Sequence, residues 1–137
     1  MLMKKSDLVY WMARLIAVII MGQTLYFKFT AAEESVFIFT AVGMEPWGRI
    51  GVGILELIAS LLLLIPTTVW AGSLLAFGLM VGALGMHLTM LRIEVKGDGG
   101  QLFIYALVVA LCAAFSFWKS KDQVPDFIKV FLSSFLK

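Results

Sequence analysis

The sequence predicts an all-α integral membrane protein, a single domain whose four spanning helices pack as a bundle. Of its 137 residues, 61% are hydrophobic and only 15% are charged, against roughly 25% charged residues in an ordinary globular domain. Four apolar segments reach or approach the roughly 20 residues that a helix needs to cross a bilayer. Runs such as LIASLLLLI lack the alternation of barrel strands, so the spans must be helical.

The predicted spans cover residues 8–29, 47–65, 69–91 and 102–118. The first follows Lys4 and Lys5 and is longer than the apolar core of a signal peptide, so we expect it to be retained. Only residues 66–68 separate the second span from the third, which makes these two helices antiparallel neighbours. The fourth is short and can borrow Gln101 and Lys119 at the interfaces.

Two further segments are apolar but too short to cross. Residues 35–42, SVFIFTAV, are expected to form an interfacial segment or re-entrant lid at the outer mouth of the bundle. Residues 124–136 place Phe127, Phe131 and Phe135 at helical spacing beside lysines. This pattern predicts a C-terminal amphipathic helix on the membrane surface.

The distribution of basic residues predicts the orientation. An even number of spans puts both termini on one side, and the positive-inside rule makes that side the cytoplasm, as in a protein of the inner membrane. The side of the termini collects Lys4, Lys5, Arg14, Lys119, Lys121, Lys129 and Lys137, and the other side has Lys28, Arg49, Arg92 and Lys96. These scattered charges, with a net charge of only +2, give no support for nucleic-acid binding.

Glu56 is the deepest charged residue of the outer half. Counted from Trp47 at about 1.5 Å per residue, it lies about 13 Å below the outer rim, too deep for a short side chain to reach water. A charge near the bilayer centre costs about 2.5 kcal/mol or more, so an ionisable residue there is a functional candidate. Arg49 lies two turns earlier on the same face, and Gly51 and Gly53 leave room beside this stripe.

Polar side chains of all four spans fall in the same outer half, so we expect a ligand pocket that is open to the outer face, floored near Glu56 and roofed by residues 35–42. The cytoplasmic half is almost purely apolar apart from Arg14, which can snorkel to the surface as an anchor. The alternative is a closed hydrogen-bond network that fixes helix register. The predicted pocket residues are Gln23, Lys28, Glu45, Arg49, Glu56, His87, Gln101 and Tyr105.

Glu56 and His87 are the candidates for proton transfer. One histidine with one deep carboxylate is too thin a ligand set for zinc, iron or haem, and the single Cys112 cannot form a disulfide or a cysteine-based zinc site, so no metal is expected. Gly78 and Gly82 form a GxxxG pair roughly opposite His87. We expect them to seat a neighbouring helix or a second copy of the chain rather than to line the pocket.

Several of these features occur together in one family. An early arginine (Arg14), Lys28 in YFKF, the stretch GMEPWGR, a GxxELxxxLLLLxP run ending at Pro66 and GAxGxHL in the third span resemble the DoxX family of small four-helix membrane proteins. The resemblance implies a four-span bundle. For some members it implies a membrane subunit of quinone-linked sulfur or thiol redox systems, including thiosulfate:quinone oxidoreductase, and for others a part in complexes against oxidative stress or in assembly and sorting of client proteins.

The resemblance places Lys28, Glu45, Arg49 and Glu56 at recurring charged positions of that family without making any of them catalytic. This chain lacks the cysteine pair that thiol-exchanging relatives use, which argues against direct disulfide chemistry.

Three hypotheses about function follow. The first is a membrane subunit of a redox complex that binds a quinone, a lipid or another small hydrophobic ligand in the pocket; any enzymatic role would be as part of a quinone-linked oxidoreductase. The second is a non-enzymatic scaffold or chaperone whose charged cluster is structural. The third, a small transporter, is disfavoured because the chain has no obvious broken helix or inverted repeat.

Overall fold

The computed structural model describes residues 4–137, and this part of the chain folds into helices joined by turns, without a strand. Its elements are α1 (Lys5–Phe29), α2 (Glu33–Ala41), α3 (Trp47–Leu64), α4 (Val69–Met86), the π-helical turn η1 (His87–Leu91), α5 (Gln101–Ser120), the 3-10 turn η2 (Lys121–Gln123) and α6 (Asp126–Phe135). The all-helical prediction is therefore confirmed.

Four segments are long and apolar enough to cross a membrane, as predicted: Lys5–Phe29, Trp47–Leu64, Val69–Leu91 and Gln101–Gln123. The last is longer than the expected 102–118, because the helix continues through Lys119 and Ser120 and then tightens into η2.

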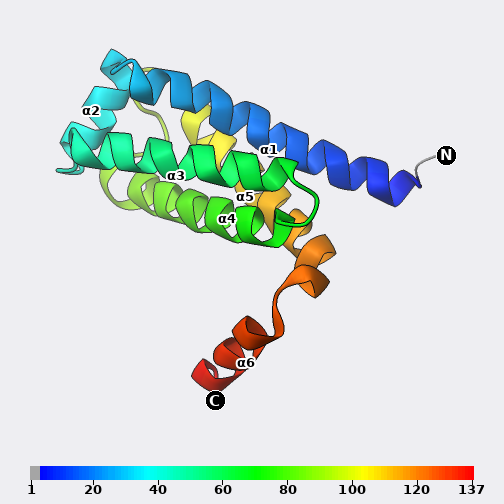
Figure 1. Ribbon diagram of the computed structural model, residues 1–137. Helices are drawn as coiled ribbons and strands as arrows, with labels where there is room; N and C mark the ends of the chain where they lie inside the picture. The colour runs from blue at the N-terminus through cyan, green and yellow to red at the C-terminus, as the bar shows by residue number, and fades with distance from the viewer. Residues whose placement is uncertain (1–3) are drawn as a thin grey trace.

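The four long helices lie side by side as a bundle (Figure 1). Helix α1 packs against α3 and α5, and α4 packs against the same two, so α1 and α4 occupy opposite corners. We call the end at which α1 begins and α5 ends the terminal end, and the opposite end, over which α2 lies, the α2 end. The start of α1 and the end of α5 therefore lie at the same end, as four antiparallel helices require, and α6 leads away from that end (Figure 1).

Small residues fill the bundle and large apolar residues cover it. Alanines of all four long helices are at most 1% exposed: Ala17, Ala59, Ala76 and Ala113. Meanwhile, large outward-facing side chains such as Leu8, Ile19, Leu74 and Leu111 are more than half exposed. Close packing through small residues beneath an apolar surface is typical of helices in lipid, where hydrophobicity does not drive helix association.

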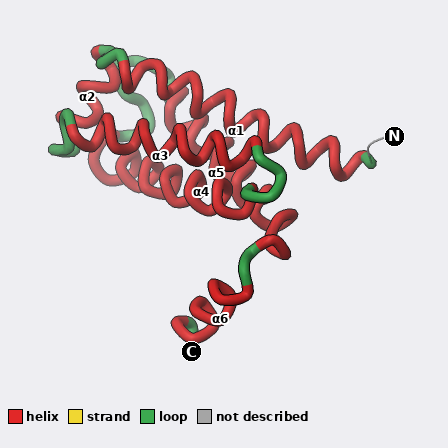
Figure 2. Tube along the Cα trace, in the orientation of Figure 1, coloured by secondary structure: helices red, strands yellow, loops and turns green. Residues whose placement is uncertain are grey.

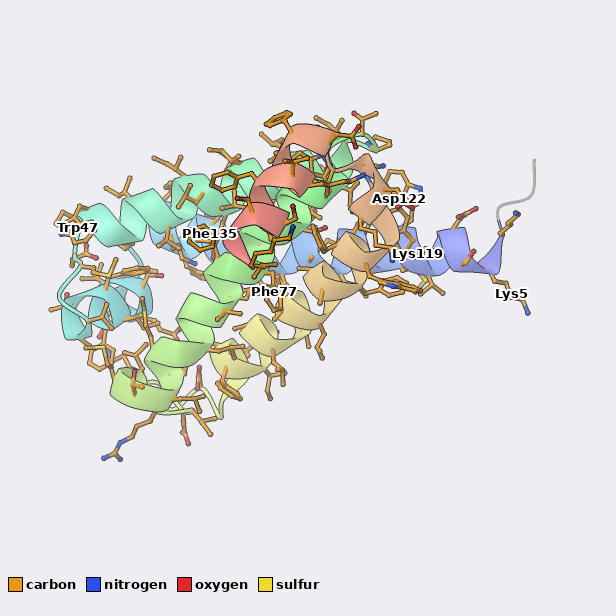
Figure 3. The ribbon with its side chains drawn as sticks, turned by 90° about the horizontal axis from the view of Figure 1, so that it is seen from below. Lys5, Trp47, Phe77, Lys119, Asp122 and Phe135 are labelled. Atoms are coloured by element: carbon orange, nitrogen blue, oxygen red, sulfur yellow. The ribbon has the colours of Figure 1, made fainter. Side chains whose placement is uncertain are left out.

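Helices α3 and α4 touch backbone to backbone near the terminal end. A Cβ atom placed on Gly72 of α4 would lie 2.8 Å from the Leu63 nitrogen and 2.9 Å from the Ala59 oxygen. From this contact the two helices diverge toward the α2 end, and Figure 3 shows the separation between α3, which starts at Trp47, and the far end of α4 beyond Phe77. The divergence leaves space inside the bundle at the α2 end.

The terminal half of the bundle is more polar than expected. Arg14 is only 1% exposed; its Nε donates a hydrogen bond to the Leu63 oxygen at 2.7 Å, and its guanidinium carbon lies 3.7 Å from the centre of the Trp11 ring. The prediction of a snorkelling anchor is therefore wrong, because α3 supplies a carbonyl at the level of Arg14. The prediction of an otherwise apolar half is wrong as well, since four serines are buried there: Ser60, Ser73, Ser116 and Ser120.

The predicted C-terminal helix is present as α6, which is carried away from the four long helices by the loop after η2 (Figure 2). Phe127, Phe131 and Phe135 are 66–82% exposed, and they lie three or four residues apart as one face of a helix requires. In the absence of packing partners within the bundle, this face remains open.

Asp98 organises the loop that leads into α5. Its carboxylate accepts hydrogen bonds from the backbone N–H groups of Val95 (3.0 Å), Gly100 (2.8 Å) and Leu102 (3.2 Å). Partial burial by itself raises the pKa of Asp98, but the three N–H donors outweigh it and hold the pKa below its usual value. The negative charge also faces the positive end of the α5 dipole.

Replacing Asp98 with alanine is expected to lower the free energy of unfolding by about 1 kcal/mol, because the N–H groups of Val95, Gly100 and Leu102 lose their acceptor. Since the folded pKa is depressed, the contribution of Asp98 is fully present above about pH 4 and is lost as the pH falls through the lower folded value. Unfolding measured from pH 7 to pH 3 checks both points. The Asp98→Asn variant, which keeps an acceptor oxygen, should lose less stability; equal losses would contradict the capping role.

Candidate functional site

A cavity of about 270 Å³ lies inside the bundle in the half nearer α2. Helices α1 to α5 all contribute to its wall, which is mainly apolar. The polar side chains on the wall are Thr24, Lys28, Glu34, Ser35, Glu56, His87 and Tyr105. The cavity therefore brings together groups from five helices that are far apart in the sequence.

A buried ion pair forms one side of this cavity. The Lys28 Nζ atom lies 3.0 Å from Oε2 and 3.3 Å from Oε1 of Glu56, and the two side chains are only 13% and 4% exposed. The Thr24 hydroxyl, one turn before Lys28 on α1, lies 3.4 Å from the same Oε2. Because Thr24 and Lys28 are four residues apart, they share the face of α1 that meets α3. Glu56 is thus held from one side and faces the cavity on the other.

Arg49 belongs to a different pair. Its Nε lies 2.8 Å and 3.0 Å from the two carboxylate oxygens of Glu45, one turn earlier, and its Nη1 donates to the backbone oxygen of Lys28. Arg49 therefore ties the start of α3 to the C-terminal end of α1, whose carbonyls carry partial negative charge. Arg49 makes no hydrogen bond or ion pair with Glu56, whose charged partner is Lys28.

His87 occupies the opposite wall at the first residue of η1. Its Nδ1 lies 2.8 Å from the Arg92 backbone oxygen, and its ring meets Phe103 edge to face at 5.7 Å between centroids. A carbonyl oxygen can only accept, so Nδ1 carries a proton, and in the neutral ring Nε2 then keeps its lone pair. His87 therefore offers a hydrogen-bond acceptor at a site where the regular helix widens into a π-helical turn, a feature common near functional sites.

Tyr105 contributes a phenol to the same cavity. The Gln101 side-chain amide donates to the Tyr105 oxygen at 2.6 Å, which leaves the phenol proton free to donate. Gln101 itself is exposed and lies off the cavity wall. It acts on the cavity only through Tyr105.

Four of the eight predicted pocket residues line the cavity: Lys28, Glu56, His87 and Tyr105. The other four, Gln23, Glu45, Arg49 and Gln101, do not line it. Gln23 precedes Thr24 and so points about 100° away from it around α1, into an exposed position. Glu45 and Arg49 form an ion pair with each other beside the end of α1. The room expected at Gly53 is filled, because a Cβ there would lie 3.0 Å from the Phe29 ring.

Three polar residues of the wall are not among the eight predicted: Thr24 of α1, and Glu34 and Ser35, which α2 contributes together with Ile38 and Phe39. The pair of glutamates before the apolar run of SVFIFTAV is a helix-start signal that could have identified this segment as a helix. The segment lies over the cavity at the place expected for its roof.

Gly78 and Gly82 also line the cavity, although they were expected to lie outside it. They do face away from His87 around α4, but the cavity extends through the gap between the diverging α3 and α4 and reaches the glycine face. A Cβ atom on either glycine would meet no atom within 4 Å.

No protein-family model matches the chain, and neither the curated proteins nor the solved structures contain a match to it. Within residues 4–137, no group of three or more His, Cys, Asp or Glu side chains is placed to hold a metal ion. The functional argument therefore depends on the cavity and on its ion pair.

Proposed function

We propose that this chain is an integral membrane protein that binds a small hydrophobic ligand, a quinone or a lipid-like molecule, in the cavity beside Lys28 and Glu56. The observation that carries the proposal is a buried ion pair that faces a mainly apolar cavity of about 270 Å³. Sites for small molecules are typically apolar with a few polar groups that orient the ligand. A purely structural ion pair has no need of an open cavity beside it.

The surface of the bundle supports a location in the membrane. Four long helices present large apolar side chains outward while alanines and glycines pack between them. The excess of lysine and arginine at the terminal end favours a cytoplasmic location of both termini, with the cavity in the outer half of the inner membrane.

The polar groups of the wall suit a quinone ring. Lys28 and the free Tyr105 proton can donate hydrogen bonds to ring carbonyls, and His87 Nε2 can accept from a ring hydroxyl. Reduction of a quinone to a hydroquinone takes two electrons and two protons. In this proposal a partner redox subunit supplies the electrons, and Glu56 and His87 pass the protons. The resemblance to the DoxX family agrees with this role and is itself part of the proposal.

Binding of a short-tailed benzoquinone to the purified protein tests the proposal. We expect saturable binding that raises the melting temperature, and a loss of affinity of about tenfold or more in the Glu56→Gln variant, because hydrogen bonds to charged groups are worth about 1.5–3 kcal/mol. Glu33→Gln is the matched control, since Glu33 is also paired with a lysine (Lys96, 2.8 Å) but is exposed and off the wall. Absence of binding, together with a purified protein free of hydrophobic molecules, would refute the proposal.

A non-enzymatic scaffold or chaperone is the second candidate, and the contacts of Arg49 favour it. Arg49 joins Glu45 and the end of α1 without reaching the cavity, which is a structural arrangement. In this case a client protein would dock on α2 or on the glycine face of α4.

A further inference from the structure

The cavity is open sideways, between α3 and α4. These helices are in contact at Gly72 and separate toward the α2 end (Figure 3). On the α4 side of the gap lie Gly78 and Gly82, both exposed and both on the cavity wall. On the α3 side, Val52 lies one turn before Glu56 on the same wall. Because neither glycine has a side chain to close the gap, the cavity communicates with the surroundings of the bundle at mid-height.

A second, shallow groove that is open to the surroundings lies along the outside of α4. It is lined by Trp70, Ala71, Leu74, Leu75, Gly78 and Leu79, so it contains no charged or polar side chain apart from the indole of Trp70. Gly78 and Leu79 belong to both hollows. From Gly78 the groove runs eight residues toward the terminal end, about 12 Å at about 1.5 Å per residue.

We propose that the cavity and the α4 groove hold a single amphiphilic ligand, whose hydrogen-bonding head lies against Lys28 and Glu56 and whose long apolar tail leaves between α3 and α4 and lies along α4. This inference rests on the proposed function and deepens it, because it makes the ligand a long-tailed molecule that enters from the lipid. The polar groups are confined to the cavity and the groove is apolar, which matches the two parts of such a molecule. Continuity through Gly78 and Leu79 identifies the occupant of the groove as the tail of the same ligand.

The test compares two ligands with the same head, a short-tailed benzoquinone and a benzoquinone with a long isoprenoid tail, bound to the protein in lipid nanodiscs. The Gly78→Leu variant places a side chain at the point where the two hollows meet. We expect it to weaken binding of the long-tailed ligand by about tenfold or more, the loss that follows when two or three methylene groups lose buried contact, and to weaken binding of the short-tailed ligand less, since Gly78 lies on the cavity wall as well as in the groove. Gly22→Leu is the matched control, an exposed glycine on α1 with open space around it and off both walls.

Ala71→Phe is the more selective variant, because Ala71 lines the groove but not the cavity. It should weaken binding of the long-tailed ligand by a similar factor and leave the short-tailed ligand within about twofold, and it also serves if Gly78→Leu fails to fold. If the wild-type protein binds the short-tailed ligand but both variants treat the two ligands alike, the tail path is wrong while the proposed function stands. If the wild type binds neither ligand, the proposed function fails and this inference fails with it. If Gly78→Leu separates a dimer into monomers without changing the ratio of the two affinities, the glycine face is a contact between copies of the chain and the inference is overturned.

Discussion

Replacing Lys28 with methionine is expected to lower the free energy of unfolding by about 3 kcal/mol, because Glu56 then keeps its buried position without its partner. The carboxylate is 4% exposed and has Lys28 at 3.0 Å as its one charged contact among the described residues. Thr24 at 3.4 Å offers only a long hydrogen bond in place of the ammonium group. Methionine preserves most of the volume of lysine, so the loss of stability measures the effect of removing the charge.

The reverse variant is expected to be milder. In Glu56→Leu, Lys28 loses its partner, but it lies in the last turn of α1 and its long side chain can turn toward the outer rim, so we expect a loss of about 1 kcal/mol. The double variant should recover most of the loss, because both charges are then gone. Unfolding by denaturant in a fixed detergent, for the wild type and all three variants, gives the coupling energy.

The exposed pair Glu33–Lys96 is the control for this cycle, since the same replacements there should show no measurable coupling. A Lys28→Met variant as stable as the exposed-pair variants would contradict a buried, paired Glu56.

A second cycle with Arg49→Ala and Glu56→Ala separates the two candidate functions. The two residues make no contact with each other, although both bind Lys28, Arg49 at its backbone oxygen and Glu56 at its ammonium group. A ligand site therefore predicts a coupling energy below about 1 kcal/mol, whereas stronger non-additivity would favour the scaffold.

The spans and the pairing of elements could be predicted from the sequence because they follow from strong physical constraints. The length and hydropathy of a spanning helix are set by the bilayer, and residues 66–68 leave no choice for the placement of α3 against α4. Glu56 could be recognised for the same reason, since its depth follows from simple counting along one helix. Its wall neighbours Lys28, His87 and Tyr105 lie at comparable depths on the other helices.

What the sequence could not give is how far one helix is shifted along another. Arg14 is two turns into its span, and counting along α1 alone places it near the surface. In the structure it meets Leu63, close to the end of α3, because α1 extends beyond the turn between α3 and α4 (Figure 1). A carbonyl near a helix end therefore replaces water as the acceptor for Arg14.

Counting along the sequence also does not decide which glutamate pairs with Arg49. Arg49 could pair with Glu45 or Glu56, since four and seven residues both bring a side chain to its face of a helix. Glu45 precedes Pro46 outside α3, and only the fold of that turn brings its carboxylate to 2.8 Å from Arg49. The divergence of α3 and α4 could not be predicted from the sequence either. Small residues such as Gly72, Gly78 and Gly82 permit close contact between helices but also permit an opening.

Gly72→Ala is expected to destabilise the protein by about 2–3 kcal/mol, through overpacking at the contact between α3 and α4. The new methyl carbon would lie 2.8 Å from the Leu63 nitrogen and 2.9 Å from the Ala59 oxygen, and backbone atoms cannot rotate aside as a flexible side chain does. The helices must therefore move apart where they are held together.

Gly78→Ala on the same helix is the matched control, because its Cβ meets nothing within 4 Å. Alanine stabilises a helix interior by about 1 kcal/mol relative to glycine, so the stability of this variant should stay equal or rise. Unfolding free energies of the two variants give the comparison, and equal stabilities would show that α3 and α4 are not in backbone contact at Gly72. Because that contact fixes the point from which α3 and α4 diverge, the Gly72→Ala variant should also bind the short-tailed ligand more weakly, as the cavity walls lose their fixed separation.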